Sequence, residues 1–377
     1  VEEASTYTQL TFKCLEDKQM KQTKEVGIVI GRMNPPHLGH LYIIEEALKN
    51  SDFVIIVLGS SRQPPTPKNP FDVDWRGQLL TQMCSERNLD VNRMIVSDVQ
   101  DYLYSDLEWI NAVKKRVNYY TYQRYGNTFN WKYTLYGYEK DESSEYLRWF
   151  SDFAKYVQIN KPYLDSNGQM VSSTRIRELM FCQGIVSLGN HLLVDTYSES
   201  ILTQFEEWMF TPEFHNLEQD YEYYKEYKNR WSVAPFPPVF VTGDAVVLCN
   251  GHVLLVTRKG PPARDTLALP GGFINQDETI KDCIIRELRE ETKIDVPPGK
   301  LKNCMRQIQV FDAPQRSLRG RTITHAGLIV LDEPKLPRVK GADDAQSAQW
   351  LSLHLLDANQ HRFFEDHYHI ISCLMTI

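Results

Sequence analysis

One stretch, residues 272–294, restricts most strongly what the C-terminal half of this chain can fold into. It reads GFINQDETIKDCIIRELREETKI, and Ile280, Ile284 and Leu288 form one apolar stripe of a helix. We expect Asp277 to cap that helix. Another face carries three carboxylates at spacings where like charges destabilise an isolated helix: Glu287, Glu290 and Glu291. A solvated acidic face is the simpler alternative, but the Pro-Gly-Gly before the helix and an arginine within it favour a site for a hard divalent cation.

The stretch resembles the Nudix box, G-x5-E-x7-R-E-U-x-E-E-x-G-U, in which U is aliphatic. Gly272, Glu278 and Arg286 occupy fixed positions, and Lys293 alone departs, in place of the second glycine. That glycine follows the helix, where a left-handed backbone is easy for Gly and costly for other residues. The resemblance implies that Gly272 lies at the substrate. It also implies that Mg²⁺, with Mn²⁺ as the alternative, is held by Glu287, Glu290 and Glu291.

Length and composition limit the class of protein. At 377 residues the chain is long for one hydrophobic core, and two domains are the natural expectation. The net charge of −7 argues against a nucleic-acid partner attracted by bulk charge. The seven cysteines include no Cys-x-x-Cys pair, so reduced thiols are expected. No apolar run approaches membrane-spanning length and no signal peptide opens the sequence, so we expect a cytoplasmic protein without a membrane partner.

The N-terminal half alternates strands and helices. A strand at 26–31, a helix at 41–50 and a strand at 53–58 form a βαβ unit of a parallel sheet. The alternation continues with a helix at 73–87, a strand at 94–96, a helix at 106–122 and a strand at 133–136. Ligands of such sheets bind at the carboxyl ends of the strands, where His37 and His40 fall.

Two motifs in this half resemble those of nucleotidyltransferases. His37-Leu38-Gly39-His40 matches H-x-G-H, and the run at 171–177 resembles the second motif, S-x-T-x-I-R. Ser172 or Ser173 can cap a helix whose free N–H groups face phosphate together with Arg177. The resemblance implies that both histidines contact the phosphates of ATP. The further phosphate-binding residues that it implies are Gly31, Arg32, Lys68, Ser172, Ser173, Thr174 and Arg177.

The surrounding residues resemble one branch of that family, the archaeal type of nicotinamide mononucleotide (NMN) adenylyltransferase. The matching runs are GRMNP at 31–35, GSS at 59–61 and NPF at 69–71. By this resemblance Asp106 and Trp109 receive the nicotinamide end of NMN. Plain core packing is an equally good explanation of Trp109, because buried tryptophans are common in folded domains.

Residues 191–234 contain no motif and are expected to form a helical connector. Prolines at 235–238 then mark a boundary, because they forbid a continuing helix. Beyond it Asn250-Gly251 between two apolar runs predicts a β-hairpin. Further strands are expected near 306–311, 322–331 and 349–351, and a closing helix from Phe363. The run RSLRG at 316–320 resembles an R-D-P-R-G stretch of Nudix proteins that handle ADP-ribose, which implies that Arg316 and Arg319 contact the substrate.

The combination resembles bifunctional NMN adenylyltransferase/Nudix hydrolases. It implies an α/β chain with a Rossmann-like nucleotidyltransferase domain on a parallel sheet and a Nudix α/β/α domain on a mixed sheet. The expected divisions are an extension at 1–25, a nucleotidyltransferase domain at 26–190, the connector at 191–234 and a Nudix domain at 235–377. The implied reactions are NAD synthesis from ATP and NMN, and hydrolysis of ADP-ribose to AMP and ribose 5-phosphate.

Two alternatives stay open at this point. The first domain can instead adenylate or cytidylate another phosphate ester, since H-x-G-H is shared by several such enzymes. The second domain can instead sense ADP-ribose or NAD without hydrolysing it, although its intact glutamates argue against this. The oligomeric state, including a homo-oligomer, is also open.

Overall fold

The computed structural model describes residues 22–126, 129–139, 142–160 and 162–375. Most of the extension predicted at 1–25 therefore lies outside the described residues. Its last residues do not form an extension, because the first strand already begins at Thr23. Among the described helices, none combines the length and the apolarity needed to cross a bilayer.

The first half of the chain forms a five-stranded sheet in the order β3-β2-β1-β4-β5, with every neighbouring pair parallel. Its strands are β1 (Thr23–Gly31), β2 (Phe53–Ser61), β3 (Met94–Gln100), β4 (Asn130–Gly137) and β5 (Lys155–Gln158). The helices that follow them are α2 (Leu38–Lys49), α3 (Val73–Glu86), α4 (Asp106–Tyr125) and α5 (Ser173–Gln183). The central strands carry apolar residues on both faces, as expected of a sheet covered on both sides.

Helices cover the two faces of this sheet and build a separate core on each. Alternate residues of β2 divide between the cores, with Ile56 on the side of α2, α3 and α5 and Ile55 on the side of α4. Three further helices, α6 (His191–Thr196), α7 (Glu199–Met209) and α8 (Pro212–Trp231), extend the first of these cores. The stretch predicted as a connector is thus helical, and it packs as part of the first lobe.

The second half forms a mixed sheet of seven strands, with the path β10-β11-β6-β7-β12 and the short β8 and β9 beside it. Its strands are β6 (Val239–Cys249), β7 (His252–Arg258), β8 (Leu267–Ala268), β9 (Gly271–Phe273), β10 (Met305–Phe311), β11 (Arg321–Leu331) and β12 (Ala345–Ser352). Its helices are α9 (Ile280–Thr292), α10 (Pro298–Cys304) and α11 (His367–Met375). The predicted hairpin joins β6 to β7, with Asn250 and Gly251 both at positive φ.

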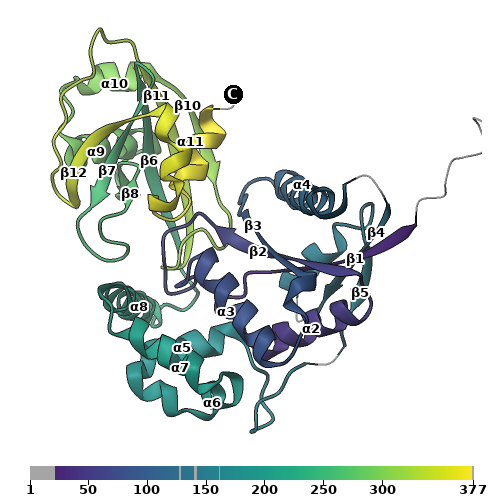
Figure 1. The fold of residues 1–377 in the computed structure, drawn as a ribbon. Coiled ribbons are helices and arrows are strands. Elements are labelled where there is room, and N and C mark those ends of the chain that lie inside the picture. Colours follow the sequence, from purple (N-terminus) through teal and green to yellow (C-terminus); the bar gives the residue numbers. More distant parts are fainter. Residues whose placement is uncertain (1–21, 127–128, 140–141, 161, 376–377) are drawn as a thin grey trace, which may run out of the picture.

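The two sheets lie in separate lobes, with α8 below the second lobe (Figure 1). The C-terminal part of α8 contacts that lobe, since Tyr227 and Trp231 pack edge-on against Phe240 of β6. The predicted α/β fold, with a parallel sheet first and a mixed sheet second, is confirmed.

Three predicted helix starts are wrong. The helix predicted at 41–50 begins at Leu38, because His37 is its N-cap. Thr279, not Asp277, caps α9, because its side chain is the one that accepts the N–H of Asp282. The closing helix begins at His367 and not at Phe363, because the backbone of Phe363 forms a β-bridge with Leu267 of β8 and its side chain is buried.

Candidate active sites

The loop after β1 places two histidines at the start of α2. His37 is the N-cap, and its Nδ1 accepts the N–H of Gly39 at 3.1 Å. The Nδ1 of His40 in turn accepts the N–H of His37 at 3.1 Å. A neutral imidazole that accepts at Nδ1 carries its proton on Nε2, so the capping contacts give both rings an Nε2–H donor. Burial lowers the pKa of His40 to about 4, so this ring is neutral at pH 7.

The N-terminus of α5 lies against the same loop. Ser172 caps α5 by accepting the N–H of Arg175, while the Ser173 hydroxyl donates to the carbonyl of Pro35 at 2.9 Å. Arg177 donates to the carbonyl of Asn34 at 2.6 Å. Two helix N-termini therefore face one cavity of about 290 Å³. The predicted residues that line it are Gly31, Arg32, His37, His40, Ser172, Ser173, Thr174 and Arg177.

The charges of this cavity favour an anion. Burial, and next the repulsion from Arg32, lowers the pKa of Arg177 to about 10. A lowered pKa means that the surroundings disfavour the guanidinium cation, and a bound anion would reverse that penalty. Backbone N–H groups at the two helix starts supply further donors for phosphate oxygens.

Lys68, predicted to bind phosphate, does not lie with the histidines. It lines a neighbouring cavity of about 500 Å³ between the two lobes, and its Nζ donates to Gln315 of the second lobe at 2.7 Å. Burial, followed by repulsion from Arg32, lowers the pKa of Lys68 to about 8. Arg32 borders both cavities, so the two form adjoining spaces at the carboxyl ends of the strands.

The two residues predicted to bind NMN, Asp106 and Trp109, have different surroundings. Trp109, in the first turn of α4, lines the cavity between the lobes and also packs edge-on against Tyr146 at 5.6 Å and Phe150 at 5.7 Å. Trp109 therefore makes core contacts and also lines a cavity, so both explanations offered by the sequence, core packing and NMN binding, have support. Asp106 is exposed and borders neither cavity.

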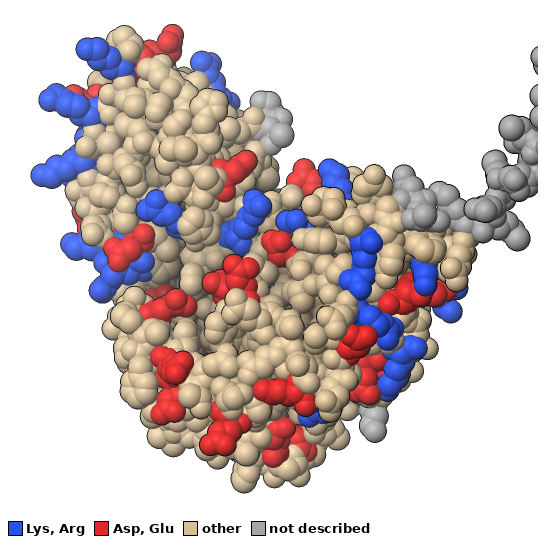
Figure 2. Space-filling model, in the orientation of Figure 1, with Lys and Arg blue, Asp and Glu red and all other residues tan. Residues whose placement is uncertain are grey.

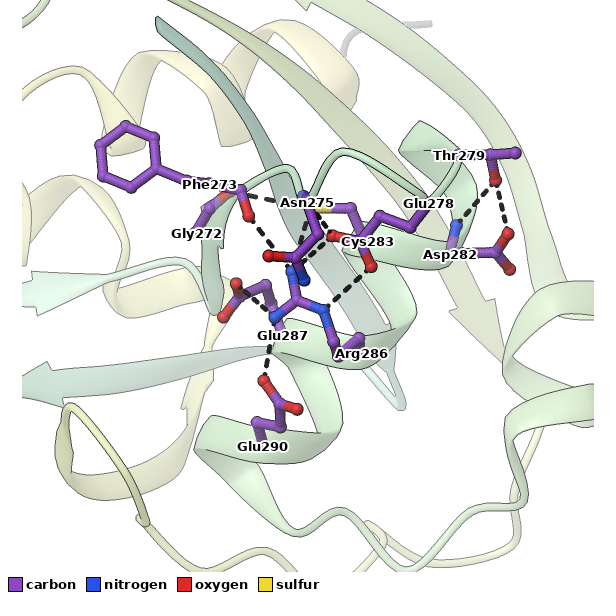
Figure 3. A network of polar contacts seen from close by, with 10 residues as sticks. All are labelled: Gly272, Phe273, Asn275, Glu278, Thr279, Asp282, Cys283, Arg286, Glu287 and Glu290. Atoms are coloured by element: carbon purple, nitrogen blue, oxygen red, sulfur yellow. Dashed lines mark hydrogen bonds and ion pairs between the residues drawn. The ribbon is translucent and has the colours of Figure 1, made fainter.

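In the second lobe, Arg286 of α9 organises the carboxylates of the Nudix-like stretch (Figure 3). It donates to Glu278 at 2.6 and 2.9 Å, to Glu287 at 2.7 Å and to Glu290 at 2.9 Å. The hydrogen bond from Arg286 lowers the pKa of Glu278 to about 2. Because one guanidinium holds all three side chains, Arg286 sets the direction in which the carboxylates point.

Glu291, the third of the predicted metal ligands, does not contact Arg286. It is only 8% exposed, and its Oε2 accepts the N–H of Gly271 at 3.1 Å. Burial raises its pKa to about 8, and burial raises that of Glu287 as well. Asp244 of β6, which no sequence pattern had indicated, is a further buried carboxylate near Glu291, and burial raises its pKa to about 6.

These residues fit a divalent metal ion. Within the described part of the chain, no three acidic, histidine or cysteine side chains are already gathered as a metal site, and Glu287 and Glu290 pair with Arg286 instead. The donors are all carboxylate oxygens, which hard cations prefer. A cation would also relieve the cost of burying Glu287 and Glu291. A Cβ at Gly272 would come within 2.4 Å of the Glu287 carboxylate, so the glycine is needed for this close approach.

The two arginines predicted for the Nudix substrate have different surroundings. Arg319 lies over the ring of Phe273 at 5.3 Å and that of Phe364 at 5.9 Å, beside residues 270–272, Pro-Gly-Gly, which we call the glycine loop. Arg316 is instead buried in the cavity between the lobes, where it donates to both oxygens of Asp366 at 2.8 Å. No local pattern had indicated Asp366 as its partner.

The departure from the Nudix pattern at Lys293 has a structural counterpart. Lys293 ends α9 in a left-handed conformation, with φ 44° and ψ 35°, as expected of the position where the family carries glycine. We predict that Lys293→Gly raises the free energy of unfolding of the second lobe, by about 1 kcal/mol or less, because Gly adopts this conformation without strain. Chemical denaturation measures the change.

The control is Arg289→Gly, at an exposed position inside the same helix. It is expected to lower the free energy of unfolding by about 1 kcal/mol, the usual cost of glycine in a helix. Hydrolytic rate should change little in Lys293→Gly, since no carboxylate is altered. A Lys293→Gly variant that unfolds earlier than the parent would contradict the interpretation.

The fold and the two sites define a chain with a nucleotidyltransferase lobe followed by a Nudix lobe. Family models agree: a cytidylyltransferase-like domain matches residues 28–179, and a NUDIX domain matches residues 240–372. The structure is similar to that of a bifunctional NMN adenylyltransferase/ADP-ribose pyrophosphatase from Francisella tularensis, solved with AMP and manganese. The two share 37% identity with a TM-score of 0.82, over 94% of this chain and 99% of that one. This chain belongs to the same bifunctional family.

Curated relatives match the lobes one at a time. A nicotinamide/nicotinic acid mononucleotide adenylyltransferase of Acinetobacter baylyi is 32% identical over 155 residues, which cover 41% of this chain and 74% of that protein. An ADP-ribose pyrophosphatase of Methanocaldococcus jannaschii is 30% identical over 116 residues, 31% of this chain. The chain spans 63% of the length of that second relative. Nucleotidyltransferases and Nudix hydrolases both use divalent metal ions.

Proposed function

We propose that the first lobe joins ATP and NMN into NAD and pyrophosphate, and that the second hydrolyses ADP-ribose to AMP and ribose 5-phosphate. The observation that carries the proposal is the cavity lined by the first residues of two helices, by the neutral ring of His40 and by Arg177. It supports binding of a polyphosphate, and it occurs in a chain whose full-length relative from Francisella is named for both reactions. We further infer that the activities reside in residues 26–190 and 235–377.

Adenylyl transfer needs positioning and charge stabilisation rather than a base. An oxygen of the NMN phosphate is already a nucleophile; it bonds to the α-phosphorus of ATP while the bond to pyrophosphate breaks. The donors of His37 and His40, together with Arg177, would hold the phosphates in line and stabilise the charge that develops on them. The neutral state of His40 suits a donor of this kind, because it requires no proton transfer.

Hydrolysis in the second lobe would use Mg²⁺, with Mn²⁺ as the alternative, held by Glu287, Glu290 and Glu291. Such an ion polarises a pyrophosphate and lowers the pKa of a bound water. Arg286 would keep Glu287 and Glu290 aimed at the site, as its contacts with both indicate. Arg319 and Phe273, beside the glycine loop, offer a cation and a ring to an anionic nucleotide.

A product screen tests both assignments together. The purified protein is incubated with ATP plus NMN, with ADP-ribose, with NADH and with an oxidised nucleoside triphosphate, each with Mg²⁺, with Mn²⁺ and with a chelator. We expect NAD from the first mixture and AMP from ADP-ribose, in both cases only with metal. NAD formation in the absence of ADP-ribose hydrolysis would overturn the second assignment and leave the first intact.

Trp109 should matter to NMN more than to ATP. We predict that Trp109→Ala raises the KM for NMN and leaves that for ATP nearly unchanged, because Trp109 lines the cavity between the lobes and not the histidine cavity. Its edge-on contacts also predict a loss of about 1–3 kcal/mol in the free energy of unfolding, less than for a fully buried ring. Steady-state kinetics and thermal melting measure the two effects.

The matched control is Trp131→Ala. Trp131 packs against the same core from β4, and it borders neither cavity. It should lose stability with both KM values preserved. Equal damage to the two KM values in Trp109→Ala would show that this tryptophan acts as core alone.

A further inference from the structure

Tyr104 crosses from the first lobe into the second. It belongs to the short segment between β3 and α4, yet its ring packs against the core of the Nudix lobe and meets Phe311 edge-on at 5.0 Å. Its hydroxyl donates to the carboxylate of Asp366. Burial raises the pKa of Tyr104, so the phenol keeps its proton and remains a donor.

The partner of Tyr104 is itself rigidly held. Asp366 is fully buried and accepts two hydrogen bonds from Arg316, both at 2.8 Å. A two-point arginine–carboxylate pair fixes the orientation of the carboxylate as well as its position. The oxygen that Tyr104 reaches is therefore a fixed anchor that belongs to the Nudix lobe.

The segment that carries Tyr104 leads directly into the cavity between the lobes. Three residues before it, Asp101 accepts hydrogen bonds from the backbone and hydroxyl of Ser60 at 3.2 and 2.8 Å, and from Gln63 at 2.8 Å. Immediately after it, Ser105 caps α4. The first turn of α4 then carries Trp109 into the cavity. Tyr104 thus lies between the fixed Asp101 and the start of the helix.

Both lobes contribute walls to this cavity. The first lobe supplies Arg32, Lys68 and Trp109, and the second supplies Gln315, Arg316, Leu318, Phe364 and Glu365. The hydrogen bond from Lys68 to Gln315 is a second contact across it. Figure 2 shows that the surface is hollowed where the lobes meet, with acidic and basic side chains around the hollow.

We propose that the Nudix lobe completes the NMN site of the adenylyltransferase lobe, and that Tyr104, anchored on Asp366, is a positioning residue of adenylyl transfer. The inference rests on the proposed function, since it takes the cavity beside Trp109 as the place where NMN binds. Tyr104 acts through α4. Its hydrogen bond to Asp366 would hold the first turn of α4, and with it the ring of Trp109, facing the wall of the cavity that the Nudix lobe supplies. It does not itself contact the reacting phosphates.

The test is Tyr104→Phe in the full-length protein. This variant keeps the ring in the Nudix core and leaves the pair of Arg316 and Asp366 in place, so it should fold. We expect the KM for NMN and its Kd, measured by calorimetry without ATP, to rise about tenfold, because α4 without its anchor would hold Trp109 in the binding-competent placement only about a tenth of the time. The KM for ATP and kcat should change by less than about threefold, as for a residue that contributes uniform binding of NMN.

Tyr119→Phe is the control, because Tyr119 is exposed on the same helix and borders neither cavity. Its kinetic constants should equal those of the parent. If Tyr104→Phe only lowers the melting temperature, with KM and Kd for NMN unchanged, Tyr104 is structural and the inference is overturned. If the parent chain forms no NAD and binds no NMN, the proposed function fails and this inference fails with it.

Discussion

Replacing Glu291 with Gln is expected to lower the hydrolysis of ADP-ribose about a thousandfold, because a lost metal ligand removes several kcal/mol of transition-state stabilisation. Among the three glutamates, Glu291 is the most buried, and it alone is held by the glycine loop rather than by Arg286. Initial rates at saturating metal measure the effect. NAD synthesis in the same preparation should be unchanged.

The melting temperature separates this chemical effect from misfolding. Burial already disfavours the ionised form of Glu291, so a neutral Gln should not lower the melting temperature measured with a chelator. Asp282→Asn is the control on the same helix, since it removes a surface ion pair with Lys302 and keeps an amide oxygen that can accept the hydroxyl of Thr279. Such a pair contributes little, and the hydrolytic rate should stay within about twofold of the parent. Near-normal hydrolysis by Glu291→Gln would refute the metal assignment.

His40→Ala is expected to lower NAD synthesis by at least about tenfold, because losing one donor that stabilises transition-state charge typically costs a few kcal/mol of barrier. Hydrolysis of ADP-ribose should survive, because the second lobe has its own site. His40 also accepts the N–H of His37, so the alanine variant loses a capping contact together with the donor. Coupled assays for NAD and AMP on one preparation measure both activities.

A second substitution separates the two roles of His40. In His40→Asn the side-chain oxygen can take the place of Nδ1 in the cap, while no group takes the place of the Nε2–H. We expect this variant to melt like the parent and yet to lose NAD synthesis as far as the alanine variant does. His191→Ala, at an exposed position on α6, should behave like the parent. Full NAD synthesis by either His40 variant would contradict the assignment of His40 as a donor in adenylyl transfer.

The sequence by itself determined the features that depend on neighbouring residues. The stripe of α9 follows from side-chain spacing along a helix. The left-handed end at Lys293 and the turn at Asn250-Gly251 follow from backbone sterics. His37 lies close to His40 because His37 is the N-cap of α2 and His40 is the third residue of that helix. Each involves residues within one or two turns, so a short motif contains all the necessary information.

The tertiary structure decided which partners these residues meet. Glu290 and Glu291 are adjacent in sequence, but only Glu291 is turned against the glycine loop and buried, which raises its pKa. Lys68 bonds to a residue 247 positions away, and Tyr104 to one 262 positions away. Such contacts exist only because two separately built cores pack against each other, and no local pattern specifies that packing. The wall that the Nudix lobe adds to the first site is therefore a property of the assembled chain.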